Sequence, residues 1–487
     1  MKLEIDFSRR TGFYLTRIFF SLMACTVIVC VQGCGGPPME PWHTERLTEE
    51  FTVDMTDEIQ TFDDYRKLED RLFAQLEKKV YARIPTGPEY ALVRYSAGSA
   101  ADPQPHRPNW NRSFEFTTDQ PAGGVLLLHG MSDSPYSLRV LGETLMQRNY
   151  WVVGLRLPGH GTAPSGLKYV KWQDMAAAVR LGMVHLASKL EQKPIHIVGY
   201  SNGSPLALNY TLEALGNDAL PVPASLVLIS PSIGLHPAAA LAKWKRRLSV
   251  LPGLGQMAWL SLIPEFDPYK YNSFATNAGE QVHSLTRSVA RRIARAPSDA
   301  SSILPPMLVF KSTVDATVSV DAVVDRLLKH LKPNRHNLVL FDINRFAAKS
   351  SLLIDDPAPF TARLTADKSL PFGLTLVTNA NPDSRAVVAH YKPPFSTKAS
   401  KAEPLHLAWP HGVISLSHVA LPFAPDDPLY GQGPPAEKDA LFLGQMAIQG
   451  ERDLLKIPYS FLLRIRYNPF YVYLETRVLE WFDQAGS

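Results

Sequence analysis

Hydrophobic and polar positions follow two alternating patterns from about residue 120 to residue 341. Short apolar runs, typical of strands buried on both faces, are separated by stretches whose apolar residues recur at helical spacing. Strands that alternate with helices predict a doubly wound, mostly parallel sheet with its ligand site at the carboxyl ends of the strands. The predicted strands span 124–130, 150–157, 195–199, 225–229, 306–311 and 337–341, and the predicted helices contain Leu138, Leu141 and Leu145 or span 172–190, 202–215 and 321–331.

Further elements flank this core. Apolar residues at helical spacing predict a packing helix over 61–81, and a second amphipathic helix is predicted over 470–483. Tyr90–Tyr95 and Arg112–Phe116 alternate like half-exposed strands, so we expect them to form an antiparallel edge of the sheet.

Two stretches interrupt the alternation of strands and helices. Residues 233–304 hold apolar and basic helical material, which predicts a helical cap insertion. Residues 345–410 are punctuated by prolines, and 374–377 and 386–389 within them predict a short hairpin. Both stretches follow sheet strands, where caps and lids over active sites are built.

One motif lies where a strand meets a helix. The predicted strand 195–199 leads into Gly199-Tyr-Ser-Asn-Gly203, and a predicted helix follows at once. Gly-x-Ser-x-Gly in this context is typical of a sharp turn that exposes its serine at the tip, and the two glycines permit the tight fold. Ser201 is therefore the candidate nucleophile, with a purely structural turn as the alternative.

A serine hydroxyl needs a base and a group that orients the base, and in such a sheet they follow in the order Ser, Asp, His. Asp315 lies in a loop directly after the predicted strand 306–311, where a helix-capping aspartate is the alternative. His418 lies in a late loop flanked by serine and apolar residues, and the nearby His411 is the alternative base.

A developing oxyanion needs two backbone donors. The amide of Asn202, directly after the serine, is one candidate, and the amide of Met131, in the loop after strand 124–130, is the other. We expect His129 to brace this loop rather than to move protons.

Together, Leu127-Leu-His-Gly-Met-Ser-Asp-Ser-Pro135, Arg156-Leu-Pro-Gly-His-Gly161, Gly199-Tyr-Ser-Asn-Gly203 and the Asp315 loop resemble the α/β-hydrolase fold, and most of all the monoacylglycerol lipase and carboxylesterase group of serine hydrolases. The resemblance implies Ser201 as nucleophile, Asp315 as acid, His418 as base, and Met131 and Asn202 as oxyanion donors. Two features depart from the group. Asn202 replaces the Met, Gln or Gly more usual after the serine, and the insertion at 345–410 separates the acid from the base.

The first residues predict export rather than a part of the fold. Arg9, Arg10 and Arg17 accompany an apolar run over 18–31, typical of a secretory signal over 1–33, with an uncleaved anchor helix as the alternative. Gly33-Cys34 resembles the cleavage site of bacterial lipoproteins, which implies lipid on Cys34. All three cysteines precede residue 35, so no disulfide is expected in the remaining chain. We expect a tether over 34–60, a hydrolase domain over 61–487, and a membrane-anchored protein on the periplasmic side of the outer membrane.

Composition narrows the function. A formal net charge of +4 on 487 residues gives no indication of nucleic-acid binding, and neither zinc-type Cys/His spacing nor a Gly-rich phosphate loop is present, so no cofactor is expected. Because we expect a lipid-anchored hydrolase with an apolar cap, we also expect its substrate to be a small-molecule or lipid ester. The same residues would also serve an acyltransferase, a thioesterase or, without catalysis, a binding lipoprotein.

The predicted cap has two features with alternative interpretations, and the oligomeric state stays open. For Trp244 and Trp259 there are two interpretations: they line a lipid-sized pocket, or they form the cap's own core. The basic cluster 243–247 contacts anionic lipid headgroups or is a solvated helix face.

Overall fold

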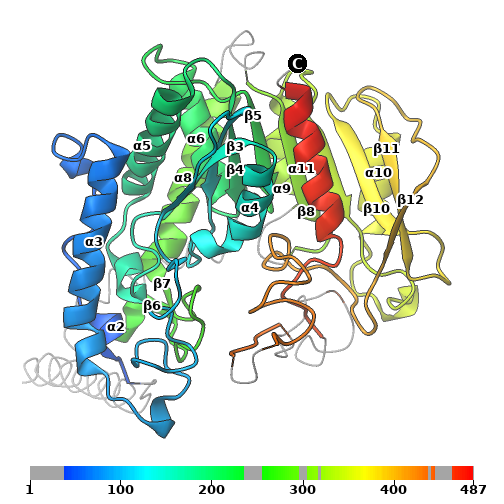
Figure 1. Cartoon of the computed structure of the whole chain (residues 1–487). Coiled ribbons are helices and arrows are strands. Elements are labelled where there is room, and N and C mark those ends of the chain that lie inside the picture. The colour runs from blue at the N-terminus through cyan, green and yellow to red at the C-terminus, as the bar shows by residue number, and fades with distance from the viewer. Residues whose placement is uncertain are drawn as a thin grey trace, which may run out of the picture. The chain divides into compact units, whose positions relative to one another are not determined.

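A ten-stranded sheet forms the centre of the computed structural model, which describes residues 38–234, 255–295, 304–315, 320–436, 440–444, 454 and 463–485 (Figure 1). The unit that begins at Pro41 contains this sheet, and the separate unit 1–40 is described only from residue 38 onward. In spatial order the strands are β1 (Phe114–Phe116), β3 (Tyr150–Leu155), β2 (Gly123–Leu128), β4 (Ile195–Tyr200), β5 (Ser225–Ile229), β8 (Met307–Ser312), β9 (Asn337–Phe341), β10 (Gly373–Asn379), β11 (Ala386–Lys392) and β12 (Glu403–Ala408).

The middle of the sheet is parallel and its edges are antiparallel. Every neighbouring pair from β3 to β10 is parallel, with Leu126 of β2 opposite Val153 of β3 and Ile197 of β4. The pairs β1–β3, β10–β11 and β11–β12 are antiparallel. A separate two-stranded ribbon consists of β6 (Trp259–Ser261) and β7 (Phe274–Ala275). The prediction of a doubly wound, mostly parallel sheet is confirmed.

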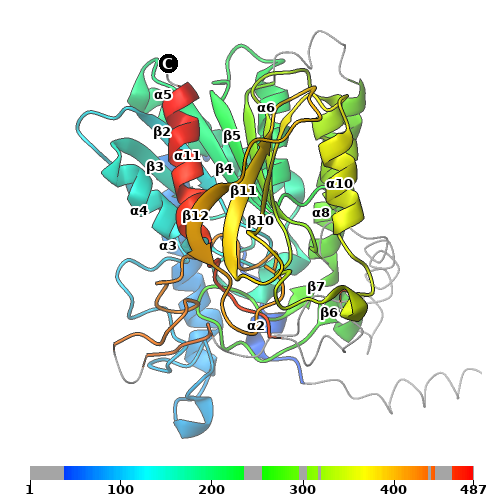
Figure 2. The same ribbon diagram turned by 90° about the vertical axis from the view of Figure 1, so that its right-hand side faces the viewer.

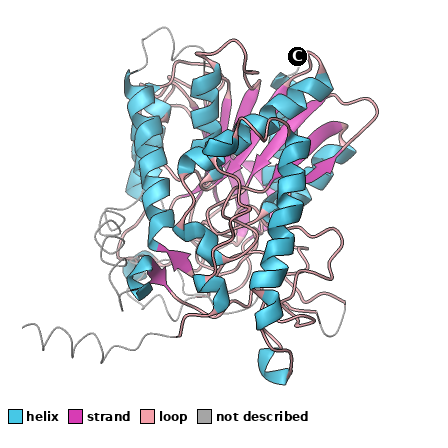
Figure 3. Cartoon of the chain, turned by 90° about the vertical axis from the view of Figure 1, so that its left-hand side faces the viewer, coloured by secondary structure: helices cyan, strands magenta, loops and turns pink. Residues whose placement is uncertain are grey.

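Helices cover both faces of this sheet. Alternate residues of its buried strands point to opposite sides, so both faces are apolar and both need a cover. Leu126 and Leu128 join the apolar core on one face, and Val125 and Leu127 join the core on the other. The first face carries α3 (Phe62–Lys79), α5 (Trp172–Leu190), α6 (Gly203–Ala214), α8 (Thr276–Arg295), α9 (Val320–Arg326) and α10 (Ala358–Ala366). The second face carries α4 (Arg139–Gln147) and α11 (Tyr471–Ala485), and Figures 2 and 3 show the two layers from opposite sides.

Local sequence explains where α3 begins and ends. The Thr61 hydroxyl accepts a hydrogen bond from the Asp64 amide at 3.1 Å, which caps the first turn. Asp63 and Asp64 lie in the first turn and Lys78 and Lys79 in the last, so both ends complement the helix dipole. Its buried apolar residues join two of the protein's cores, as the helical spacing predicted.

The predicted strand at Tyr90–Tyr95 is wrong. Pro88–Tyr90 is instead a short 3-10 helix, and Gly87 before it has φ 151°, which begins a turn rather than a strand. Tertiary contacts outweigh the alternating pattern: the Arg94 amide donates to the Glu265 carbonyl at 2.9 Å, and the Tyr95 ring is fully buried. Only the second predicted edge segment forms a strand, β1, and it pairs with β3 as expected.

The stretch 345–410 differs from the expected cover over the site. Its predicted hairpin forms as β10 and β11, but β10 pairs in parallel with β9, so the hairpin and β12 continue the main sheet. These strands appear beyond β8 in Figure 1. Sheet extension satisfies the hydrogen-bonding groups that β9 would otherwise expose at the edge.

The predicted cap is described only in part. Within it, α8 turns Val282, Leu285 and Val289 into the core beneath the sheet, and Trp259 is buried. Trp244 and the basic cluster 243–247 lie outside the described residues. Over the ranges that the structure describes, no helix combines the length and apolar character needed to span a membrane.

Candidate active site

The turn between β4 and α6 holds Ser201 in a strained conformation. Its φ is 51°, in the left-handed region that non-glycine residues rarely occupy. A Cβ at Gly199 would lie 2.7 Å from the Gly203 backbone, and a Cβ at Gly203 would lie 2.1 Å from the Leu128 carbonyl oxygen. Both positions therefore require glycine, and the strand–turn–helix geometry is the one that the motif predicted.

Ser201, His418 and Asp315 form one hydrogen-bonded series. His418 Nε2 lies 2.9 Å from Ser201 Oγ, and His418 Nδ1 lies 2.9 Å from Asp315 Oδ2. Ser201 follows β4 and Asp315 follows β8, so both extend from carboxyl ends of parallel strands. All three residues are buried. This arrangement allows the imidazole to take the serine proton while the carboxylate fixes its tautomer and orientation.

Asparagine side chains anchor the segment around His418, which follows β12. Asn344, just after β9, donates from its amide nitrogen to the Val413 carbonyl at 2.7 Å. Asn468 donates to the Leu421 carbonyl at 3.2 Å, on the other side of the histidine. The chain is thus attached to the end of β9 before His418 and to the start of α11 after it, which explains how His418, 103 positions beyond Asp315, reaches that carboxylate.

Asp315 also contacts a lysine. Lys311, in β8, donates from Nζ to Asp315 Oδ2, and both side chains are fully buried. Burial alone would raise the pKa of Asp315, but the Lys311 ammonium and the His418 ring outweigh it and hold that pKa well below its usual value. Asp315 is therefore ionised across the physiological pH range.

The loop after β2 lies directly against Ser201. A Cβ at Gly130 would lie 3.1 Å from Ser201 Cβ, so only glycine allows this approach without displacement. Among the described residues, the amides of Met131 and Asn202 donate to no protein acceptor. Asp133 of the same loop binds Lys270 Nζ at 2.7 Å. Two free amides next to the serine are what an oxyanion site requires.

Two buried histidines shape this loop from behind. His129 accepts the Leu157 amide at Nε2, 3.0 Å away, and its Nδ1 lies 2.8 Å from the Gly130 carbonyl oxygen. His160 Nε2 lies 3.2 Å from Met131 Sδ. Burial lowers the pKa of His129 well below its usual value and lowers that of His160 to about 4, so both rings are neutral. These contacts agree with the bracing role predicted for His129.

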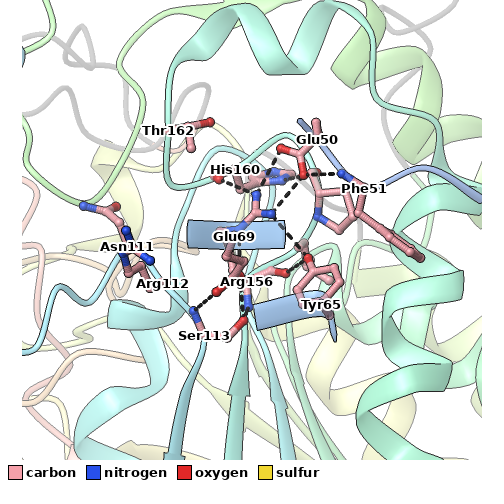
Figure 4. Close-up of polar contacts among 12 residues, drawn as sticks. Glu50, Phe51, Tyr65, Glu69, Asn111, Arg112, Ser113, Arg156, His160 and Thr162 are labelled. Carbon is pink, nitrogen blue, oxygen red and sulfur yellow. Dashed lines mark hydrogen bonds and ion pairs between the residues drawn. The ribbon is translucent and has the colours of Figure 1, made fainter. Parts of the chain in front are cut away.

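Arg156 ties the segment before the sheet to this region (Figure 4). Its guanidinium contacts Glu50 at 2.9 and 3.0 Å and Glu69 at 2.8 Å, and also donates to the His160 carbonyl at 3.1 Å. The Tyr65 hydroxyl donates to the Arg156 carbonyl at 2.7 Å. The network joins α3 and the Glu50 segment to the loop whose His160 contacts Met131.

The structure brings together all the predicted site residues that it describes: Ser201, Asp315, His418, Met131 and Asn202. His411, the alternative base, is exposed in a turn. Cys34 lies outside the described residues. The described parts of the chain contain no group of three or more His, Cys, Asp or Glu side chains that could hold a metal ion.

Sequence reasoning missed two neighbours of these residues. Ser232 Oγ lies 3.1 Å from Ser201 Oγ, and Lys311 contacts the acid. A lysine within the apolar run of a buried strand was a visible signal for Lys311. Ser232 had no comparable signal, because only the fold places residues after β5 beside the turn that follows β4.

Comparisons with known proteins cover part of the chain. Residues 119–344 match the family described as "Serine aminopeptidase, S33", a range that includes β2 to β9, Ser201 and Asp315 but not His418. A thermostable monoacylglycerol lipase of Bacillus sp. (strain H-257) is 35% identical over 85 residues, which are 18% of this chain and 33% of the lipase. The chain thus spans about a third of the length of that curated relative.

Solved structures show lower identity. A structure reported for the metagenome-derived lipolytic enzymes LipS and LipT is 19% identical, covers 47% of this chain and 87% of its own, and has a TM-score of 0.38. The monoacylglycerol lipase of Paleococcus ferrophilus is 18% identical, covers 47% and 88%, and has a TM-score of 0.37. The order and direction of the strands, together with the family match, identify the α/β-hydrolase fold.

Proposed function

We propose that this protein is a serine hydrolase of carboxylic esters, in which Ser201 is the nucleophile, His418 the base and Asp315 the acid. The observation that carries the proposal is the continuous series of 2.9 Å contacts from Ser201 Oγ through the His418 ring to Asp315. A serine hydroxyl becomes an effective nucleophile only when a base within hydrogen-bonding distance accepts its proton.

The reaction follows from these positions. Ser201 Oγ attacks the ester carbonyl while its proton moves to His418 Nε2, and the amides of Met131 and Asn202 stabilise the oxyanion. The imidazolium then gives the proton to the departing alcohol, which leaves an acyl group on Ser201. A water molecule activated by His418 releases the acid and restores the serine.

The substrate class that we propose is an acyl ester of the monoacylglycerol or lysophospholipid kind. The named activity of the Bacillus relative favours a glycerol ester, although the match covers only part of both chains. The name of the matching family, serine aminopeptidase, favours a peptide bond instead, so an aminoacyl substrate belongs in the same test.

Replacing Ser201 with alanine tests the activity. We expect kcat for p-nitrophenyl esters to fall by about four orders of magnitude or more, because the acyl-enzyme cannot form. Labelling by a fluorophosphonate probe should disappear in the same variant. Ser188→Ala, at an exposed position of α5, is the matched control and should retain both signals.

Further variants and substrates complete the test. His418→Ala should lose activity whereas His411→Ala should not. A Ser201→Ala protein that cleaves esters at the wild-type rate would overturn the proposal. If the enzyme cleaved an aminoacyl p-nitroanilide in preference to acyl esters from C2 to C16, the proposed substrate class would change from an ester to a peptide-like compound.

We infer that lipid on Cys34 attaches this hydrolase to a membrane outside the cytoplasm. The inference depends on the N-terminal sequence: a basic segment, an apolar run and Gly33-Cys34. Attachment would place the enzyme beside lipid esters, which agrees with the proposed substrate class.

A further inference from the structure

Lys311 is a charged residue in the middle of the sheet. It lies in β8 opposite Leu340 of β9, and its side chain is fully buried. Burying an ammonium group costs several kcal/mol unless a nearby negative charge and hydrogen bonds compensate. Its Nζ binds Asp315, four residues further on, at the carboxyl end of the same strand.

The contact involves the oxygen that also holds the base. Asp315 Oδ2 accepts from Lys311 Nζ and lies 2.9 Å from His418 Nδ1. Lys311 therefore extends by one hydrogen bond, beyond Asp315, the series that leads through His418 to Ser201. A cation bound to that oxygen both restricts the rotation of the carboxylate and withdraws part of the negative charge that faces the imidazole.

We propose that Lys311 is a positioning residue that fixes Asp315 against His418 and keeps His418 unprotonated to a lower pH than Asp315 alone would. The proposal rests on the function proposed above. With neutral His418 the three side chains carry a net charge of zero, and with imidazolium they carry +1. The buried ammonium thus opposes protonation of the base in the resting enzyme.

Other described groups near the base are Tyr200, Asp133, Lys270 and Arg464. The Tyr200 ring lies 5.7 Å from the His418 ring, and burial raises the pKa of Tyr200 well above its usual value, so it is neutral. Asp133 also acts electrostatically on His418, but it is bound to Lys270. Arg464 acts on Tyr200. The same groups are present in wild type and in every Lys311 variant, so the comparison among these variants tests the charge at position 311.

Lys311→Met removes the charge and keeps an apolar chain of similar length. We expect the acid limb of kcat/KM against pH to move upward by about one pH unit, because imidazolium becomes more favourable beside a carboxylate that no longer shares its charge. At a pH below the wild-type acid limb, a shift of this size lowers kcat/KM of the variant about tenfold relative to wild type. Lys311→Arg retains the charge and should keep the limb at the wild-type pH.

The decisive measurement is the rate of inactivation by a fluorophosphonate across pH 4.5–9, which reports Ser201 reactivity without product release. Lys329→Met removes an exposed lysine that pairs with Asp325 and should leave the profile unchanged. If Lys311→Met does not fold, Lys311→Gln, a neutral hydrogen-bond donor, provides the same comparison. The proposal would be overturned if the acid limb of Lys311→Met or Lys311→Gln stayed within about 0.2 pH units of the wild-type limb. It would also be overturned if Lys311→Arg shifted the limb as far as Lys311→Met does. Loss of labelling in wild type itself would instead reject the hydrolase function.

Discussion

At the residue scale, the candidate site is built from features that are costly on their own. Ser201 adopts φ 51°, and Lys311 and Asp315 are charged but fully buried. Left-handed backbone at a non-glycine residue costs about 1–3 kcal/mol, and buried charges persist only with partners. Such costs are typical of positions kept for chemistry rather than for stability.

Asp315→Asn should reduce the free energy of unfolding at pH 7 by about 3 kcal/mol, because Lys311 would lose its carboxylate in a buried environment. The pKa of Asp315 is lowered in the folded state. Its contribution to stability is therefore present above the unfolded pKa of about 4 and is lost as the pH falls below that value.

Urea unfolding of wild type and Asp315→Asn from pH 7 to pH 3 measures this effect, and the difference between them should shrink below about pH 4. Asp325→Asn, which removes the exposed partner of Lys329, is the control and should change stability little. A Lys311→Met/Asp315→Asn double variant should recover most of the loss. A constant difference across the pH range would contradict the assigned role of the ion pair.

At the element scale, close packing between α6 and β2 holds the serine turn. The hydrophobic pattern predicted both elements, because each is a continuous run with one periodicity. It failed at Tyr90–Tyr95, where buried tertiary contacts outweigh alternation, and it did not show that β10–β12 would join the main sheet. Strand pairing is decided by neighbours distant in sequence, which a local pattern does not contain.

Gly203→Ala should destabilise the protein by about 3 kcal/mol, because the added Cβ would lie 2.1 Å from the Leu128 carbonyl oxygen and force α6 away from β2. Gly216→Ala, where the nearest atom lies 3.7 Å from the added Cβ, is the matched control. Denaturant unfolding followed by circular dichroism compares the two. Equal stabilities would show that the turn relaxes without cost.

At the scale of the whole molecule, segments far apart in sequence meet near the carboxyl ends of the parallel strands. The Glu50 segment reaches Arg156, and the loop of His418 is fastened by Asn344 and Asn468. Two separate sets of contacts thus support the loop that holds Met131 and the loop that holds His418. The N-terminal residues before this unit add the proposed attachment to a membrane.

Cys34→Ala should move the protein from the detergent phase to the aqueous phase in a Triton X-114 partition, because the proposed lipid would no longer be attached. Cys30→Ala alters a cysteine within the apolar run and should leave partitioning unchanged. Metabolic labelling with a radioactive fatty acid provides an independent measurement. A Cys34→Ala protein that stays in the membrane fraction would indicate the uncleaved anchor helix instead.

The sequence by itself determined the strand and helix order of the core and the identity of Ser201, because periodicity and a strand–turn–helix motif are local properties. It also predicted Asp315 and His418 as the partners of Ser201, with His411 as the alternative base. Only the tertiary structure brought His418 rather than His411 to Ser201, placed Lys311 on Asp315, and turned 373–408 into sheet. The physical reason is that loop closure and strand pairing depend on contacts between residues distant in sequence, 217 positions for Ser201 and His418, and a local pattern does not contain such contacts.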